Sequence, residues 1–274
     1  MKWALIAAVN NEQVLQSCLL GSLGVASAAE VLLQRRYGSA AQAYNDAISR
    51  AQSDILVFAH QDMYFPEGWG ERLMGTVEAL EREDANWGVL GAWGVTESGG
   101  RAGHVYCTAG IRMLGGAFEG VRQIRVLDEV VLIFRKARGL RFDEQLPGFH
   151  LYGADLCLEA ERRDLKCYAM SAFCIHNSNM YSMLPWEFWK AYLMLRSKWK
   201  SRLPILTPCV LITRSCWPML HWNMERAVSL LTGRNKPLGK RVENPATLYN
   251  EMLRTRVVTA LADCAQSGGR TGVA

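Results

Sequence analysis

Three polar segments of the sequence could do chemistry, and each follows a stretch that we expect to be a β-strand. His60 and Asp62 come directly after a continuous apolar run, which is typical of a strand buried on both faces of a parallel sheet. Asn10 and Asn11 follow the first apolar run of the chain, and His176 follows a later one. Ligands of open α/β sheets bind beyond the carboxyl ends of the strands. The sequence therefore predicts that these side chains are candidates for one ligand site.

Asp62 is the best placed of these residues to bind a divalent cation. Mn²⁺ and Mg²⁺ prefer oxygen ligands, tolerate imidazole and leave coordination positions open for phosphate oxygens. A cation at Asp62 could therefore bridge a nucleotide diphosphate and neutralise the charge on it as it departs. His60 would share a face with Asp62 if the strand continued. The alternative is that Asp62 caps the following turn and His60 is an ordinary polar residue, and spacing alone favours this alternative.

The elements that would position these residues alternate between strands and helices, which predicts an α/β sheet. Repeated glycines between 88 and 94 lie inside an apolar run, so we expect them to allow close packing of a strand and not to bind phosphate. The expected strands are 3–9, 30–35, 55–59, 87–95, 121–134 (interrupted at 128–129) and 166–174. The expected helices are 12–20, 40–51, a helix from the turn at 63–69 to about 82, and 152–163.

The composition is that of a globular protein with a substantial core. Of 274 residues, 50% are hydrophobic and 21% are charged. The apolar run at 3–9 is short and passes into polar residues without a cleavage pattern, so it predicts a first strand and not a signal peptide. No apolar run reaches the roughly 18–20 residues of a membrane-spanning helix. The eight cysteines are scattered without a C-x-x-C pair, which predicts reduced thiols and not a zinc site. These features together predict a cytoplasmic protein.

Several motifs, in a consistent order, resemble glycosyltransferase family 2 over about residues 3–178. The segments 43–48 and 54–62 resemble a divergent branch in which His-Gln-Asp stands where classical members carry Asp-x-Asp. Further similar segments follow at 127–129, 142–144 (Phe-Asp-Glu), 149–156 and 175–178. The resemblance implies a GT-A fold, the nucleotide-diphospho-sugar transferase fold, with a mixed, mainly parallel sheet flanked by helices.

The resemblance also implies roles for individual residues. Asp62 and His176 would hold a divalent cation, Mn²⁺ or Mg²⁺, with His60 beside the nucleotide or the metal. Asn10 and Asn11 would lie near the nucleoside. The implied nucleotide-binding residues are Asn10, Asn11, Asn45, His60 and Asp62.

Two departures from the family pattern concern the acceptor and the nucleotide. Classical members carry a catalytic carboxylate at the start of the helix after the Phe-Asp-Glu turn, and the matching position here is Gly153. An inverting transfer needs a base within hydrogen-bond reach of the acceptor hydroxyl. Asp155 is the nearest carboxylate and could be that base or a structural residue, with Asp128 and His150 as further candidates. The family's Asp-Gly-Ser segment near the nucleoside has no counterpart, so the identity of the nucleotide stays open.

From residue 184 the sequence changes character, so we divide it into a catalytic domain at 1–183 and a helical extension at 184–274, which closes with a helix near 246–262. Eleven Lys or Arg residues lie between 190 and 241, opposed only by Glu225, and five of the nine tryptophans lie in or beside this stretch. Contact with an anionic membrane would explain both features. The alternative, which we prefer for the aromatic residues, is that they pack the extension onto the catalytic domain and that the charges are a solvated rim. The charge excess could equally bind a diphosphate or an acidic glycan. Four of the apolar residues fall on one stripe of an expected helix, and these are Phe188, Tyr192, Leu195 and Trp199.

The resemblance implies a hexosyltransferase-like enzyme of polysaccharide biosynthesis. It would move a sugar from a nucleotide diphosphate donor to a glycan or lipid-linked acceptor, with metal dependence and inversion. We expect a cytoplasmic protein with peripheral contact at the inner face of the membrane, and no nucleic-acid partner because no recognised module accompanies the charge. Two alternatives are a catalytically silent GT-A-like module that binds nucleotide sugar, glycan or membrane, and a metal-dependent hydrolase that uses water as the nucleophile.

Overall fold

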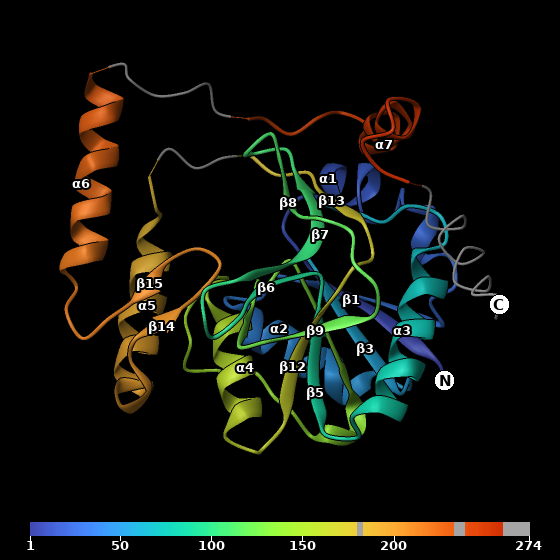
Figure 1. Cartoon of the computed structure of the whole chain (residues 1–274), viewed down its shortest axis with the longest axis horizontal. Coiled ribbons are helices and arrows are strands. Elements are labelled where there is room, and N and C mark those ends of the chain that lie inside the picture. Colours follow the sequence, from blue (N-terminus) through green and yellow to red (C-terminus); the bar gives the residue numbers. More distant parts are fainter. Residues whose placement is uncertain (180–182, 233–238, 260–274) are drawn as a thin grey trace, which may run out of the picture.

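The computed structural model describes residues 1–179, 183–232 and 239–259. Its main sheet has seven strands in the order β2-β1-β3-β11-β5-β12-β9 (Figure 1). β2, β1, β3, β5 and β12 run in one direction, while β11 and β9 run against their neighbours. The expected mixed, mainly parallel sheet is confirmed. The strand bounds are β1 Trp3–Val9, β2 Glu30–Arg35, β3 Ile55–Ala59, β5 Trp87–Gly91, β9 Val121–Ile124, β11 Val131–Arg135 and β12 Lys166–Met170.

A second sheet has the order β10-β6-β7-β13-β4, with β8 paired to β7. It shows where the expected strands were wrong. The stretch 87–95 is two strands in different sheets, β5 and β6, and 166–174 leads through β12 into β13 of the second sheet. The glycine-rich stretch 99–120, where we expected no strand, contains the antiparallel pair β7 and β8. The remaining bounds are β4 Met63–Tyr64, β6 Trp93–Val95, β7 Arg101–Cys107, β8 Arg112–Gly115, β10 Val126–Leu127 and β13 Cys174–His176.

Helices cover both faces of the main sheet because alternate side chains of a strand point to opposite faces. Ala4 and Ile6 of β1 pack in the cluster that includes α2, α4 and α5, whereas Leu5 and Ala7 pack in the cluster that includes α1, α3 and α7. The expected helices are present with ends that differ by a few residues. The bounds are α1 Glu12–Ser17, α2 Ala40–Arg50, α3 Trp69–Glu83, α4 Tyr152–Glu161, α5 Trp186–Lys198, α6 Trp217–Leu231 and α7 Pro245–Arg254.

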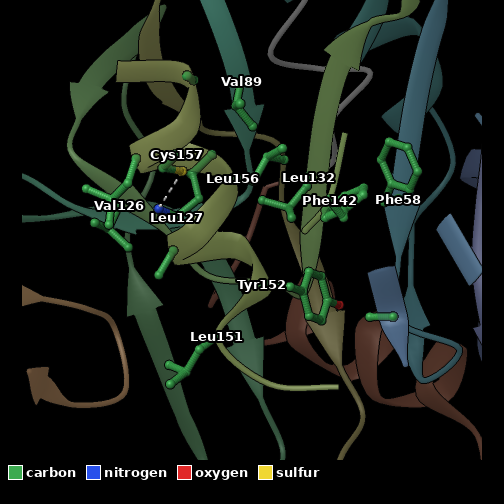
Figure 2. Packing of buried hydrophobic residues seen from close by; sticks show 14 of the residues in the cluster. Phe58, Val89, Val126, Leu127, Leu132, Phe142, Leu151, Tyr152, Leu156 and Cys157 are labelled. Atoms are coloured by element: carbon green, nitrogen blue, oxygen red, sulfur yellow. Dashed lines mark hydrogen bonds between the residues drawn. The ribbon is translucent and has the colours of Figure 1, made fainter. Parts of the chain in front are cut away.

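Helix α4 is fastened to the sheet by close packing (Figure 2). The Leu127 N–H donates a hydrogen bond to Cys157 Sγ at 3.4 Å, in the middle of the apolar contact between α4 and β10. Beside it, the rings of Phe58, Phe142 and Tyr152 contact one another at centroid distances of 5.2 and 5.8 Å. This cluster holds the Phe-Asp-Glu turn and the first residue of α4 against β3.

The repeated glycines of β5 and β6 are packing residues, as expected. A Cβ atom at Gly91 would lie 2.6 Å from a Leu127 methyl group and 2.8 Å from the Val131 carbonyl oxygen. At Gly94 it would lie 2.8 Å from the Val126 carbonyl oxygen. Only a residue without a side chain lets these strands approach so closely.

The aromatic stripe of α5 is buried, which confirms the packing interpretation and rules out this stripe as a membrane surface. The four residues named above belong to the hydrophobic cluster on the α2–α4 side of the main sheet. Part of the basic excess is also used internally, because Lys198 pairs with three carboxylates and Arg202 pairs with Glu161.

The rest of the extension is less compact. A short hairpin, β14 Ile205–Leu206 and β15 Leu211–Ile212, leads to α6, which stands at the side of the molecule away from the two larger sheets (Figure 1). The helix expected near 246–262 corresponds to α7, and its last expected residues lie outside the described part of the chain. Among the described residues, no helix combines the length and apolar character needed to cross a membrane.

Candidate functional site

Three of the residues singled out in the sequence come together at the ends of β3 and β13. One ligand atom from each of His60, Asp62 and His176 lies within 4.8 Å of the other two. His60 follows β3, and its N–H donates to the Val130 carbonyl oxygen at 3.1 Å. His176 is the last residue of β13 and pairs with Met63 of β4, directly after Asp62. Backbone pairing therefore brings together side chains that are more than 100 residues apart.

Gln61 ties the end of β1 to the same site. Its Oε1 accepts the N–H groups of both Asn10 and Asn11 at 3.0 Å, and its Nε2 donates to Asn10 Oδ1. Asn11 also caps α1 by accepting the Val14 N–H. Asn10 and Asn11 thus lie beside the His60–Asp62 segment and are exposed, as a nucleoside contact would require.

The charges in the cluster are strongly coupled. Burial would raise the pKa of Asp62, but His176, His60 and Arg241 hold it well below its usual range. Burial would lower the pKa of His176, but the Asp62 carboxylate 3.5 Å away and the Cys107 thiol raise it to about 10. Burial lowers the pKa of His60 to about 4. At neutral pH the cluster is thus an ion pair with a neutral imidazole beside it.

Tyr152 orients the neutral imidazole. Its hydroxyl donates to the Glu129 carbonyl oxygen at 3.2 Å and lies 2.9 Å from His60 Nε2. A hydroxyl whose proton is used in this way accepts from Nε2–H, so the lone pair of His60 is on Nδ1. Orientation of a histidine by a hydrogen bond from its other nitrogen is typical of metal ligands.

The Asp128–Glu129 pair lies beside this cluster, between β10 and β11. Burial, and then the Asp128 charge, raise the pKa of Glu129 to about 8, and burial also raises the pKa of Asp128. Asp128 Oδ1 accepts the Val130 N–H at 3.2 Å, and Glu129 Oε1 accepts the Leu151 N–H at 3.0 Å. Two neighbouring carboxyl groups in such a place share one proton near neutral pH.

Close packing explains why a glycine stands at position 153. A Cβ atom there would lie 3.0 Å from the Leu127 carbonyl oxygen and 3.1 Å from the Glu129 nitrogen. The start of α4 therefore rests on the backbone of the carboxylate pair, and a side chain at Gly153 would press against it.

The geometry does not support Asp155 as a base. Its side chain is buried, with the residue 2% exposed, and its oxygens accept from Lys198 Nζ at 2.9 Å and from Trp199 Nε1 at 2.7 Å. Both oxygens are used in an ion pair that joins α4 to α5, so neither is open to an acceptor hydroxyl.

The contacts of Asn45 are with the Phe-Asp-Glu turn, and His150 lies against α5. Asn45 holds the Phe-Asp-Glu turn, accepting the Phe142 N–H at 3.0 Å and donating to the Phe142 carbonyl oxygen at 2.8 Å. It also lines a polar hollow of about 500 Å³ with Arg141 and Glu144. His150 packs on Phe188, and burial lowers its pKa.

The residues present fit a divalent cation. Two donor atoms at right angles around an ion with bond lengths of about 2.1 Å lie about 3 Å apart, close to the 3.5 Å between Asp62 Oδ1 and His176 Nε2. His176 would release its proton on becoming a ligand, so binding of the cation would be favoured by higher pH. Two imidazoles with one carboxylate suit Mn²⁺ and later transition metals better than Mg²⁺, which prefers oxygen ligands.

Sequence reasoning missed several contributors to this site. Gln61, Tyr152 and Glu129 stood inside segments that we had singled out, but their roles depend on distant partners. Arg241, whose Nη2 lies 3.1 Å from Asp62 Oδ2, was counted only in the basic excess. No pattern in the sequence connects it to a residue 179 positions earlier.

Comparison with known proteins gives one family and one fold. A sequence model described as "Glycosyltransferase like family" matches residues 4–192. The curated protein "ATP synthase subunits region ORF 6" of Fuscovulum blasticum is 29% identical over 141 residues, which are 49% of this chain and 55% of that protein. The chain thus spans about half the length of the curated relative.

Solved structures with a similar fold include that of GalNAc-T7 with UDP, GalNAc and Mn²⁺. It has a TM-score of 0.52 at 7% identity, and the match covers 73% of this chain and 49% of the GalNAc-T7 chain. S. aureus TarS 1–349 has a TM-score of 0.49 at 13% identity, and the match covers 72% of this chain and 65% of the TarS chain. The likeness to GalNAc-T7 confirms the expected GT-A fold.

The three-ligand cluster predicts a single divalent cation site. His60→Ala, Asp62→Ala and His176→Ala should each weaken Mn²⁺ binding by roughly tenfold or more, because each removes one of three protein ligands. Calorimetric titration of Mn²⁺ measures this. His221→Ala, which changes an exposed histidine of α6, is the matched control. Unchanged Mn²⁺ affinity in all three cluster variants would exclude a metal at this position.

Proposed function

The chain belongs to the glycosyltransferase-like family, and from that premise we propose that it transfers a hexosyl group from a nucleotide diphosphate to a glycan or lipid-linked acceptor. The observation that carries the proposal is the convergence of His60, Asp62 and His176 at the strand ends of a GT-A fold. A divalent cation held there, with Mn²⁺ preferred to Mg²⁺, would neutralise the charge that develops on the departing diphosphate.

The surrounding residues support the donor half of the reaction. Asn10 and Asn11 are exposed next to the cluster, held by Gln61, where a nucleoside can approach. In the transfer, the bond from the anomeric carbon to the diphosphate breaks and a bond to the acceptor oxygen forms on the opposite face of the sugar, which inverts the configuration. The acceptor proton must then pass to a base on the protein.

A panel of nucleotide diphosphates tests the donor half. Wild-type protein should bind one of them, with UDP as the first choice, only when Mn²⁺ is present, and Asp62→Ala should lose this binding. Calorimetry with and without Mn²⁺ measures it, with Asp54→Ala, a carboxylate near the opposite end of β3, as the control. If no nucleotide diphosphate binds in the presence of Mn²⁺, the proposed transfer is wrong.

For the acceptor half we propose Asp128 as the base in place of Asp155. Burial and the Asp128 charge raise the pKa of Glu129 to about 8, so Glu129 holds a proton near neutral pH and Asp128 beside it is the carboxylate that we assign as base. The pair stands where Gly153 leaves room at the start of α4. The Glu129 carbonyl oxygen accepts from the Tyr152 hydroxyl, and the next residue, Val130, accepts from the His60 backbone N–H. A carboxylate beside the cation site can take the proton of the attacking hydroxyl.

Three substitutions test this assignment in an assay of donor turnover. Asp128→Asn should lower turnover by about 10²-fold or more while nucleotide binding is retained. Glu129→Gln imitates the protonated state and should retain turnover at neutral pH. Asp155→Asn should lower stability instead, because it weakens the ion pair between the buried Asp155 and the partly buried Lys198 ammonium. Full turnover in Asp128→Asn would reject Asp128 as the base.

The raised pKa of Glu129 also predicts how the stability of the protein depends on pH. Because its pKa is raised on folding from 4.5 to about 8, the folded state holds the proton more tightly than the unfolded state. Its contribution to stability is therefore complete below about pH 4.5 and is lost as the pH rises through 8. The Glu129→Gln variant should lack this part of the pH dependence of the melting temperature.

We further propose that the protein works in the cytoplasm at the inner face of a membrane, with α6 as the contact surface. Five of its six exposed large apolar residues, all except Leu230, fall on one stripe, since their spacing of three or four matches the helical period. They are Trp217, Leu220, Met224, Val228 and Leu231. Exposed Lys190, Lys200, Arg214 and Lys240 supply positive charge in the same extension, which suits anionic headgroups.

Vesicle sedimentation tests this surface. The protein should bind vesicles that contain phosphatidylglycerol more strongly than neutral phosphatidylcholine vesicles, and the double variant Leu220→Glu/Met224→Glu should reduce binding severalfold by placing charge on the stripe. Val31→Glu, at an exposed position of β2, is the control. Equal vesicle binding by wild type and the double variant would exclude α6 as the contact.

A further inference from the structure

A segment of the C-terminal extension is anchored directly at the candidate metal site. The buried Asn177, next to His176, exchanges two hydrogen bonds with the backbone of Val242, each 2.8 Å long. The Arg241 N–H donates to Asn179 Oδ1 at 2.9 Å, and the Gly239 N–H donates to the Ala109 carbonyl oxygen at 3.1 Å. The backbone of this segment is thus anchored on both sides of Arg241.

Gly239 shows how tightly the segment is seated. A Cβ atom at this position would lie 2.0 Å from the Thr108 carbonyl oxygen and 2.5 Å from the Ala109 carbonyl oxygen. Thr108 follows β7, and its N–H bonds to the His176 carbonyl oxygen. The contact therefore places the segment against the same strand ends that carry the metal cluster.

This anchoring directs the Arg241 side chain to Asp62. Its Nε donates to the Asn177 carbonyl oxygen at 2.8 Å, and its Nη2 donates to Asp62 Oδ2 at 3.1 Å. The other carboxylate oxygen of Asp62 faces His176. The guanidinium therefore contacts the same carboxylate that a divalent cation would need.

We propose that Arg241 takes the place of the cation on Asp62 in the metal-free protein and binds the donor diphosphate once the cation has displaced it. The inference rests on the proposed function and adds a residue to the diphosphate site. Because the segment is held through its backbone and Asn177, the guanidinium stays beside the cluster after it leaves Asp62.

The charges explain why the exchange would go in this order. A divalent cation and a guanidinium repel each other at one carboxylate, so binding of the first displaces the second. A diphosphate then brings several negative oxygens to the site, and the planar guanidinium forms paired hydrogen bonds with phosphate oxygens. The same residue thus opposes binding of the metal alone and favours binding of the metal with nucleotide.

The proposal predicts opposite effects of one substitution on two ligands. Arg241→Ala should bind Mn²⁺ alone severalfold more tightly, because a competing cation is gone. It should bind UDP in the presence of saturating Mn²⁺ roughly tenfold or more weakly, because a charge-assisted hydrogen bond is lost. UMP, which lacks the second phosphate, should lose less affinity. Calorimetry on the full chain measures all three ligands, and Lys240→Ala, the exposed neighbouring residue, is the control.

Each outcome is decisive. If Arg241→Ala leaves both affinities unchanged, or weakens Mn²⁺ and UDP binding together with a lower melting temperature, Arg241 has only a structural role and the proposal is overturned. If wild type binds Mn²⁺ but no nucleotide diphosphate, the proposed transfer fails, while the Mn²⁺ titration still decides whether Arg241 competes with the cation. Should Arg241→Ala not fold, Arg241→Gln keeps a donor for the Asn177 carbonyl oxygen and carries the same test.

Discussion

The ion pair between Asp62 and His176 is the interaction on which the site depends. Antiparallel pairing of β4 with β13 sets Met63 opposite His176, and the Asn177 N–H donates to the Asp62 carbonyl oxygen at 2.8 Å. The two side chains therefore meet because the backbone around them is paired. The pair is also partly buried, so each group shifts the pKa of the other strongly. Because these charges lie so close together, the site favours ligands whose own charge balances them.

The other elements of the site follow from that charge. His60 is kept neutral by burial and oriented by Tyr152, so it adds a ligand without adding a second positive charge. Arg241 approaches the free oxygen of Asp62, while the Asp128–Glu129 pair supplies negative charge on the side where α4 begins. Gly153 belongs to the same arrangement, because the backbone of that pair occupies the space that a side chain at 153 would need. The departure from the family pattern and the presence of two neighbouring carboxylates thus have one structural explanation.

Local patterns in the sequence were sufficient for most of the architecture. Buried strands such as β3 were read from continuous apolar runs, and α2 from apolar residues at helical spacing. The errors concern stretches that change sheet, β5 into β6 and β12 into β13. A run of apolar residues looks the same whether it stays in one sheet or crosses to another, because both environments are buried. The buried stripe of α5 was predicted correctly as packing, whereas its Lys198 was counted as surface charge although it lies among three carboxylates.

The sequence by itself determined the fold class, the family resemblance and the strand end at His60 and Asp62 as the place for chemistry. These depend on residue type and on spacing along the chain, which are local properties. Only the tertiary structure decided the partners of each carboxylate, a Lys–Trp pair at Asp155 but a backbone N–H and the Cys209 thiol at Asp128. Asp155 is used by Lys198 and Trp199, whereas Asp128 lies beside the cluster, and nothing in their local sequence separates these two environments. The same holds for Arg241, since its contact with Asp62 is created by the path of a distant segment across the strand ends.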